Sequence, residues 1–226
     1  SAALHAQTAA STPALSPLAS ELHAQLEHRS GPYTSLLHWS QLTRFYSARD
    51  YMPVWIDENG INVRAELLLA TLYRARDEGM DPGAYPLPPI RKLWSSSSPW
   101  AHIKLELLLS NTFFDYSQEL LTGQLNPQWN SLLWHIPVER PDSVALLHTL
   151  LASDDFALAL KSLPPNHPGY QRLREALARY RQIEAAAGWP TIPAGKKLHP
   201  GTRDPRVPLL RQRLQLVVAG PHGTAA

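Results

Sequence analysis

The amino-acid sequence predicts a mainly α-helical protein: an irregular multi-helix domain with proline-rich loops, followed by a short terminal helical element. Three observations lead to this fold class. Hydrophobic residues make up 44% of the chain and include seven tryptophans and eight tyrosines, which is enough for a real core. Apolar residues recur at spacings of three and four between helix start and stop signals. The 21 prolines divide these helices into several pieces, so one long bundle is excluded.

The first half of the chain carries two predicted helices and a loop. The apolar face of Tyr33–Arg49 predicts the first helix. Asn62 is placed to cap a second helix that runs to about Glu78, where Gly79 ends it. Residues 81–90 include four prolines, which fix the backbone and remove hydrogen-bond donors. We therefore expect turns and extended chain over 81–90.

The longest predicted helix is the central one. It begins at Ser98 and Pro99, a cap residue followed by a proline at the first helical position, and runs to Thr122 before Gly123. Apolar residues cover most of its surface, so we expect it to be largely buried. Glu106 lies on the apolar side of this helix.

Three further helices are predicted after the central one. Asp142 is placed to cap a helix over Ser143–Ala152, and the cluster at 153–155 starts another that runs to about Leu163. A third covers about Gly169–Ala187 and presents apolar residues on one face. The proline-rich stretch after it is a natural linker.

A last helix is predicted after Asp204 and Pro205, which repeat the pattern of a cap followed by proline. Its apolar stripe consists of Val207, Leu210 and Leu214. We expect these three side chains to be structural and to pack against a partner surface.

These signals divide the chain into four parts. We predict a flexible lead-in over 1–32, a helical domain over 33–188, a linker over 189–200 and a short helical element over 201–226. The lead-in is rich in Ala, Ser, Thr and Pro, as is typical of the segment that follows a removed secretory signal peptide.

Four segments resemble one family, in order. They are FYSARDYMPVW (45–55), EGMDPGAY (78–85), TGQLNP (122–127) and NHPGYQRLREALARYR (166–181). The apolar pattern after Pro205 is similar to the first helix of a peptidoglycan-binding repeat. Together they resemble the N-terminal scaffold region, and the start of the peptidoglycan-binding-like domain, of the large multidomain L,D-transpeptidases of Gram-negative bacteria.

The resemblance implies a non-catalytic part of a cell-wall protein. It implies a helical scaffold domain, a partial peptidoglycan-binding-like element over 201–226, and a periplasmic location after removal of the signal peptide. The expected partners are peptidoglycan, a catalytic domain or a cell-wall enzyme. The family's reaction is cysteine acyl transfer, and the sequence contains no cysteine, so we expect that the chain as given is not an enzyme and that the parent protein is an L,D-transpeptidase. No cofactor is expected.

Two other functions are open. Glu106 is a candidate general acid for a glycan-cleaving murein hydrolase, because burial raises the pKa of a carboxyl group. We favour a structural role for Glu106, in which Arg44, Arg49 or backbone donors pair with the buried carboxylate. The second alternative is a protein-interaction or dimerisation module that uses the last apolar stripe, so self-association is a prediction of the sequence.

Five residues are candidates for ligand binding. Trp129 and Trp134 lie in an irregular stretch and are candidates for a glycan contact, whereas Arg206, Arg211 and Arg213 are candidates for contacts to peptidoglycan carboxylates. The histidines form no compact ligand set, so we expect no metal. With a net charge of +2, we expect no nucleic-acid partner. No apolar run of eighteen residues predicts a membrane span.

Overall fold

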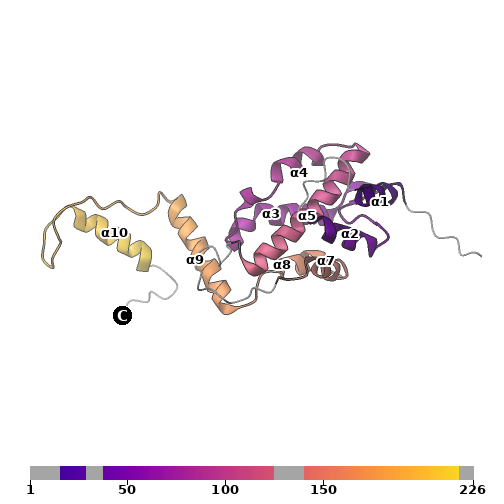
Figure 1. Cartoon of the computed structure of the whole chain (residues 1–226). Coiled ribbons are helices and arrows are strands. Elements are labelled where there is room, and N and C mark those ends of the chain that lie inside the picture. The colour runs from indigo at the N-terminus through magenta and orange to yellow at the C-terminus, as the bar shows by residue number, and fades with distance from the viewer. Residues whose placement is uncertain (1–15, 29–37, 125–139, 219–226) are drawn as a thin grey trace, which may run out of the picture. The chain divides into compact units, whose positions relative to one another are not determined.

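The structure, a computed structural model, describes residues 16–28, 38–124 and 140–218. Over these ranges it is mainly helical with a single small β-ribbon, which confirms the predicted fold class (Figure 1). The chain forms two compact units, one ending at Asn166 and the other beginning at His167. The helix after His167 thus belongs to the C-terminal unit, whereas the sequence predicts it at the end of a domain over 33–188.

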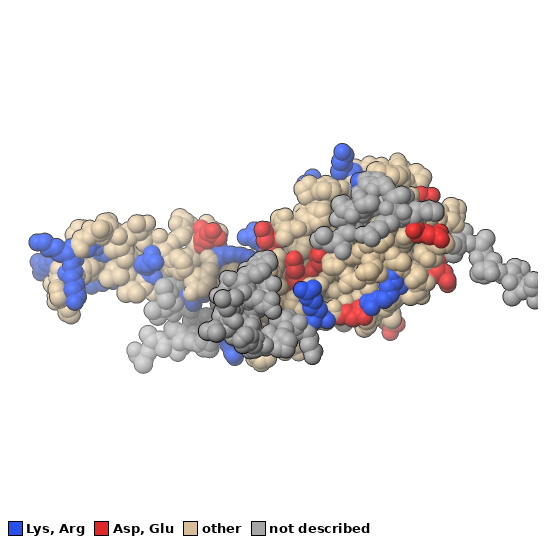
Figure 2. Space-filling view, in the orientation of Figure 1, with Lys and Arg blue, Asp and Glu red and all other residues tan. Residues whose placement is uncertain are grey.

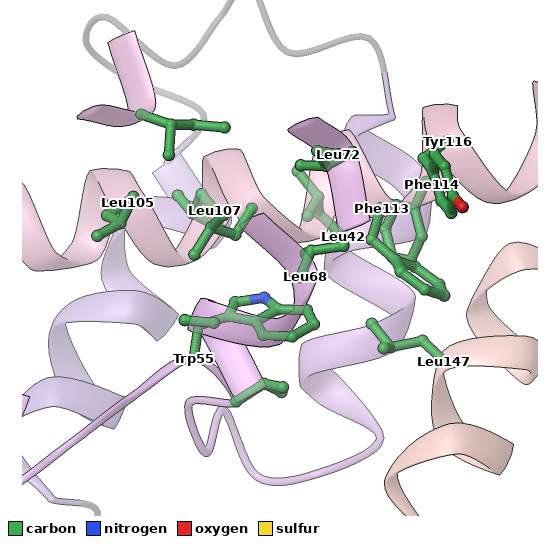
Figure 3. Packing of buried hydrophobic residues seen from close by; sticks show 14 of the residues in the cluster. Leu42, Trp55, Leu68, Leu72, Leu105, Leu107, Phe113, Phe114, Tyr116 and Leu147 are labelled. Atoms are coloured by element: carbon green, nitrogen blue, oxygen red, sulfur yellow. The ribbon is translucent and has the colours of Figure 1, made fainter. Parts of the chain in front are cut away.

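The N-terminal unit is built around one long helix, α5 (Pro99–Thr122). Its predicted ends are confirmed: the Ser98 hydroxyl accepts a hydrogen bond from Ala101 N, and Gly123 ends the helix with a φ of 82°. Fourteen of its residues are buried, so α5 is the central helix that the sequence predicted. Figure 3 shows how its aromatic and leucine side chains pack against those of other segments.

The other helices of this unit surround α5. They are α1 (Pro17–His28), α2 (Trp39–Ser47), α3 (Val63–Tyr73), α4 (Leu87–Trp94), α7 (Ser143–Leu151) and α8 (Phe156–Lys161). All except α8 contact α5 directly, and α8 packs against α3 and α7. Their buried side chains form one continuous hydrophobic core.

The ribbon lies between α2 and α3. Strand β1 (Ile56–Asp57) pairs in antiparallel fashion with β2 (Gly60–Ile61), with Ile56 opposite Ile61. It follows directly after Trp55, whose fully buried ring lies at the centre of the core (Figure 3). The ribbon is therefore a very short β-hairpin that connects the buried Trp55 to the start of α3.

Part of the expected lead-in is a packed helix. Residues 17–28 of the segment 1–32 form α1 instead of flexible chain, because Ala19, Leu22 and Leu26 recur at helical spacing and are buried against the core. The preceding residues are rich in serine, alanine and proline, and this composition predicts flexible chain, so the short apolar stripe was not recognised as a helix. Residues 1–15 and 29–32 lie outside the described residues.

The expected loop over 81–90 is also largely helical. A 3-10 turn, η2 (Pro82–Ala84), is capped by the Asp81 carboxylate, and α4 follows. Prolines at the start of α4 are compatible with a helix because the first N–H groups have no intrahelical partner. Its apolar side chains are buried in the core: Leu87, Ile90 and Leu93. Burial of this face therefore overrides the local preference of the prolines for a loop.

Several predicted caps are confirmed, although helix lengths differ. Asn62 accepts hydrogen bonds from Arg64 N and Ala65 N at the start of α3. That helix ends earlier than predicted and continues as the 3-10 turn η1 (Ala75–Glu78). Asp142 and Asp155 cap α7 and α8 in the same way. Local capping chemistry thus determines most of the starts of these helices.

The C-terminal unit contains α9 (Pro168–Ala185) and α10 (Arg206–Val218), joined by a long connection. The sequence predicts apolar residues on one face of α9, and Leu173 and Tyr180 on that face are 73% and 54% exposed. Ile183 is its one buried side chain in the described structure. Two of the four apolar residues on this face of α9 are therefore exposed, and the other two, Tyr170 and Leu177, are half-buried.

The packing of α1 can be tested by shortening one side chain. Leu22→Ala removes a fully buried leucine, and we expect the free energy of unfolding to fall by about 2–4 kcal/mol because a cavity remains. Urea denaturation of the full chain measures this change. The matched control is Leu158→Ala, at a leucine that is 61% exposed. Equal small effects of both substitutions would show that α1 is not part of the core.

Candidate functional site

The Glu106 carboxylate is fully buried in the middle of α5 and accepts three hydrogen bonds. Val54 N donates to Oε1 over 2.6 Å, Trp55 N donates to Oε2 over 3.0 Å, and the Tyr46 hydroxyl donates to Oε1 over 2.8 Å. Both oxygens are thus engaged, and two of the three donors are backbone groups of one segment. The carboxylate ties that segment to the central helix.

A second polar group one turn along α5 completes this buried network. The Ser110 hydroxyl accepts a hydrogen bond from Trp55 Nε1 over 2.8 Å and lies 2.7 Å from the Tyr46 hydroxyl. Glu106 and Ser110 therefore hold both the backbone and the indole of Trp55. A network in which every member has a partner fixes one arrangement of the core.

The arginines predicted as partners for Glu106 bond elsewhere. The Arg44 guanidinium pairs with the Asp142 carboxylate, and Arg49 donates to the carbonyl of Met52 over 2.9 Å. Of the partners predicted for a buried Glu106, the backbone N–H groups bond to the carboxylate and the two arginines do not. Sequence spacing could not indicate them, because the donors are more than fifty positions away along the chain.

The turn that delivers these donors contains two consecutive residues in the left-handed region. Asp50 has a φ of 50° and Tyr51 a φ of 57°, a conformation that costs a non-glycine residue about 1–2 kcal/mol. Tyr51 N donates to the Tyr46 carbonyl over 2.8 Å, and the His23 ring lies 4.1 Å from the Tyr51 ring. Contacts to both α1 and α2 therefore hold this turn in place.

Burial changes the protonation of this network. Loss of solvent raises the pKa of Glu106 to about 7, although the Val54, Tyr46 and Trp55 donors each lower it. Burial and the Glu106 charge likewise raise the pKa of Tyr46 well above its ordinary value. A raised pKa is what a general acid requires, but the Glu106 carboxyl has no exposed surface on which a glycan could lie. The burial and the hydrogen bonds of the carboxyl group therefore favour the structural role that the sequence predicts for Glu106.

A partly exposed polar stripe runs along α5 toward its C-terminal end. His38 Nε2 and Asp115 Oδ1 lie 2.6 Å apart, and Asn111 donates to the other Asp115 oxygen over 3.1 Å. Four residues on, the Tyr85 hydroxyl donates to Glu119 over 2.7 Å. Helical periodicity predicts Asn111, Asp115 and Glu119 on one polar stripe of this helix, but it does not indicate His38 and Tyr85 as partners of that stripe.

Two segments that carry the family resemblance meet at the end of this stripe. Gln124, from TGQLNP, donates to Glu119 over 2.9 Å and accepts a hydrogen bond from Asp81 N, which belongs to EGMDPGAY. Tyr85 belongs to the same segment as Asp81 and is buried. These residues join the end of α5 to the loop before α4, which is a structural task.

In the C-terminal unit, Arg206 is held within the protein. Its guanidinium donates to both oxygens of Asp204 over 2.9 Å and to the Lys196 carbonyl over 2.7 Å. A Cβ atom on Gly195 would lie 2.6 Å from this guanidinium, so the connection passes close against it. Arg206 therefore fastens the connection to the start of α10, and the ligand contact predicted for it from the sequence stays a prediction.

The other predicted residues of α10 have mixed surroundings. The Arg213 guanidinium lies 5.6 Å from the centre of the Trp189 ring, which also contacts Tyr180 edge-on. Arg211 is exposed. In the apolar stripe, Val207 and Leu210 are half-buried and Leu214 is 51% exposed. Trp129 and Trp134 lie outside the described residues.

The two units carry opposite charge. Residues 1–166 contain 11 Lys and Arg against 16 Asp and Glu, whereas residues 167–226 contain 10 against 3. The net charges of −5 and +7 are hidden in the total of +2. On the face drawn in Figure 2, the charged side chains of the unit that contains α9 and α10 are mainly Lys and Arg. This basic unit is suited to an anionic partner.

Within 16–28, 38–124 and 140–218, no three His, Asp or Glu side chains are grouped so that they could hold a metal ion. No described helix combines the length and the apolar character needed to cross a bilayer.

The raised pKa of Glu106 predicts a pH dependence of stability. The folded state holds a proton that the unfolded chain releases above pH 4.5, so this contribution is fully present at low pH and is lost as the pH rises through 7. We expect the free energy of unfolding to fall by about 2–3 kcal/mol between pH 5 and pH 8 from this group. Urea denaturation across this range provides the measurement.

Glu106→Gln isolates this effect from other titrating groups, such as His148, whose pKa burial lowers. The difference between wild type and Glu106→Gln should carry the predicted slope, and the exposed control Glu58→Gln should retain the wild-type profile. Parallel profiles for wild type and Glu106→Gln would contradict the assignment.

Comparison with known proteins gives one match. A family described as "Scaffold domain" matches residues 40–177, from α2 into α9. No curated protein and no solved structure matches the chain. The matched span covers more than half of the 226 residues and includes the whole Glu106 network and, apart from His38, the polar stripe of α5 with its partners Tyr85 and Gln124. The chain belongs to the scaffold-domain family.

Proposed function

We propose that this chain is the scaffold part of a periplasmic, L,D-transpeptidase-like cell-wall protein, and that it supports murein cross-linking without performing it. One observation carries the proposal. The span matched by the scaffold-domain family contains the three segments at 45–55, 78–85 and 122–127, which resemble the N-terminal region of those enzymes. The fourth segment, at 166–181, begins within the same span.

The geometry of these segments favours support over catalysis. The first supplies Tyr46 and Trp55 to the buried network of Glu106. The second and third meet at Tyr85, Glu119 and Gln124. In both places the polar groups bond to one another and hold distant parts of the chain together. A unit that is held together in this way can support a neighbouring domain and orient it.

The chemistry of the proposed parent reaction has to come from elsewhere. Cysteine acyl transfer needs a thiolate, and the sequence contains no cysteine. The glycan-cleaving alternative needs an accessible acid, and its candidate, Glu106, is fully buried. A scaffold that works with a separate catalytic domain is therefore the better account of this chain.

Binding to purified sacculi tests the murein part of the proposal. We expect the full chain to be retained, because the basic unit carries a net charge of +7 and murein stem peptides carry carboxylates. The double variant Arg203→Glu/Arg211→Glu, at two exposed arginines, should weaken retention several-fold. Retention is measured by sedimentation with the insoluble sacculi.

The matched control is Arg91→Glu, at an exposed arginine of the N-terminal unit, which should bind as wild type. If wild type is not retained, the murein contact is contradicted, and a protein partner becomes the better account of the basic unit.

A second candidate function, protein interaction, is favoured by the surface of α9. Leu173 and Tyr180 stand seven residues apart on one face and are more than half exposed. An exposed apolar stripe on an 18-residue helix is typical of a helix that packs against another protein. In this role the basic unit would join the scaffold to a partner.

Light scattering at increasing concentration tests whether that partner is a second copy. Pairing through α9 predicts a molar mass that rises with concentration in wild type and remains that of a monomer in Leu173→Glu, because a buried charge opposes association. Leu158→Glu, on α8, serves as the control. A constant monomer mass in wild type would exclude self-pairing through α9.

A further inference from the structure

A groove of about 460 Å³ lies in the N-terminal unit where three elements meet. Pro17, Leu18 and Glu21 of α1 form one side, and Ile56 and Asp57 of β1 form another. The first turn of α5 completes it with Pro99, Trp100, His102 and Ile103. Its volume and its mostly apolar lining with a few polar groups are typical of a site for a small ligand or part of a polymer.

Trp100 is the unusual residue of this groove. It is 51% exposed, whereas Trp55 is fully buried and Trp39, Trp94 and Trp189 are partly buried. The Lys104 ammonium lies 5.0 Å from the centre of its ring. Exposure of so large an apolar surface is unfavourable in water, and an indole at a groove is suited to stacking on a ligand.

The polar groups of the groove come from all three walls. Glu21 contributes a carboxylate from α1, Asp57 one from β1, and His102 an imidazole from α5. Asp57 Oδ1 accepts a hydrogen bond from Asn59 N over 2.8 Å, which orients that carboxylate on the ribbon. The groove therefore offers hydrogen-bond acceptors next to an aromatic platform.

These groups select for a neutral ligand with an apolar face and polar edges. Glu21 and Asp57 would repel an anion, the Lys104 ammonium at the Trp100 ring opposes a cation, and a wholly apolar ligand would remove both carboxylates from water without hydrogen bonds. A pyranose ring combines C–H groups on its faces with hydroxyl and amide donors on its edges. It can stack on the indole while its edges donate to the carboxylates.

The groove is formed before any ligand binds. Ile56 and Ile103 reach from its walls into the core and are 3% and 1% exposed, and α1 is anchored by the buried Leu22. The Ser98 cap fixes the first turn of α5, which carries Trp100. Little ordering is needed on binding, so a few contacts are enough for a useful affinity.

We propose that this groove binds a β-linked glycan chain, with Trp100 as the stacking platform and Asp57 and Glu21 as hydrogen-bond acceptors. The proposal gives the N-terminal unit a glycan contact separate from the basic surface of the C-terminal unit. The choice of N-acetylated sugars as the first probe rests on the proposed function.

Titration of the full chain with soluble β1,4-linked N-acetylglucosamine tetramer, followed by NMR of the indole and amide signals, tests the proposal. Cellotetraose is titrated in parallel as a β-linked glycan without acetamido groups. We expect saturable shifts at Trp100, with affinity at least tenfold weaker in Trp100→Ala and several-fold weaker in Asp57→Asn. Both side chains are exposed, so both variants should fold, and thermal unfolding checks this.

The matched control is Tyr73→Ala. Tyr73 is a 43% exposed aromatic residue that lines a different hollow with Leu87, Pro88 and Arg91, and its removal should leave glycan binding unchanged. No response to either oligosaccharide overturns the proposal, as does an equal loss in Trp100→Ala and Tyr73→Ala. So does binding of a lysine-containing apolar peptide in the groove when neither sugar binds.

The outcomes separate this inference from the proposed function. Binding of cellotetraose alone, lost in Trp100→Ala, supports the glycan groove and counts against murein as its ligand. Retention on sacculi that depends on Arg203 and Arg211, together with no response to either sugar, overturns the groove and leaves the proposed function standing.

Discussion

The hydrogen bonds of the Glu106 carboxylate are the constraint on which the rest of the N-terminal unit depends. Val54 and Trp55 enter the core in a segment that is neither helix nor strand, so their N–H groups have no ladder to join. An unsatisfied buried N–H costs about 1–3 kcal/mol, and a carboxylate that accepts from two of them replaces the missing secondary structure. The indole of Trp55 can then occupy the centre of the core.

This constraint extends outward from the carboxylate. The left-handed pair Asp50 and Tyr51 is tolerated because it brings Val54 and Trp55 to Glu106, and α1 supports the turn through His23. The ribbon follows at once and forms one wall of the groove at Trp100. A single buried carboxyl group thus determines the path of the chain from α2 to α3, and with it one wall of the groove at Trp100.

Local chemistry explains which parts of this fold could be predicted from the sequence. Asn62, Ser98 and Asp142 were assigned as caps because each bonds to N–H groups two or three residues away. The helices α1 and α4 were missed because burial of Leu22 and Ile90 stabilises them, and burial depends on the whole fold.

The candidate sites show the same contrast between local features, which the sequence indicates, and features that depend on the whole fold. The burial of Glu106 could be predicted from its position on an apolar helix face, but its donors come from a strained turn that no periodicity indicates. The internal partners of Arg206 could not be predicted either, because the Lys196 carbonyl and the close passage of Gly195 depend on the path of the connection before α10. The exposure of Trp100 could not be read from helical spacing, since it depends on how α1 and the ribbon meet α5.

The opposite net charges of the two units have a consequence for how the protein behaves in solution. A sequence isoelectric point near 8.9 suggests a basic protein that binds only to cation exchangers at neutral pH. With −5 on one unit and +7 on the other, the molecule has a surface for each kind of resin, and the isoelectric point is a poor guide to its chromatography. Attraction between unlike units of different molecules grows as salt is removed, because the Debye length rises from about 8 Å at physiological ionic strength to about 30 Å at 0.01 M. The attraction between these molecules therefore depends on ionic strength as well as on protein concentration.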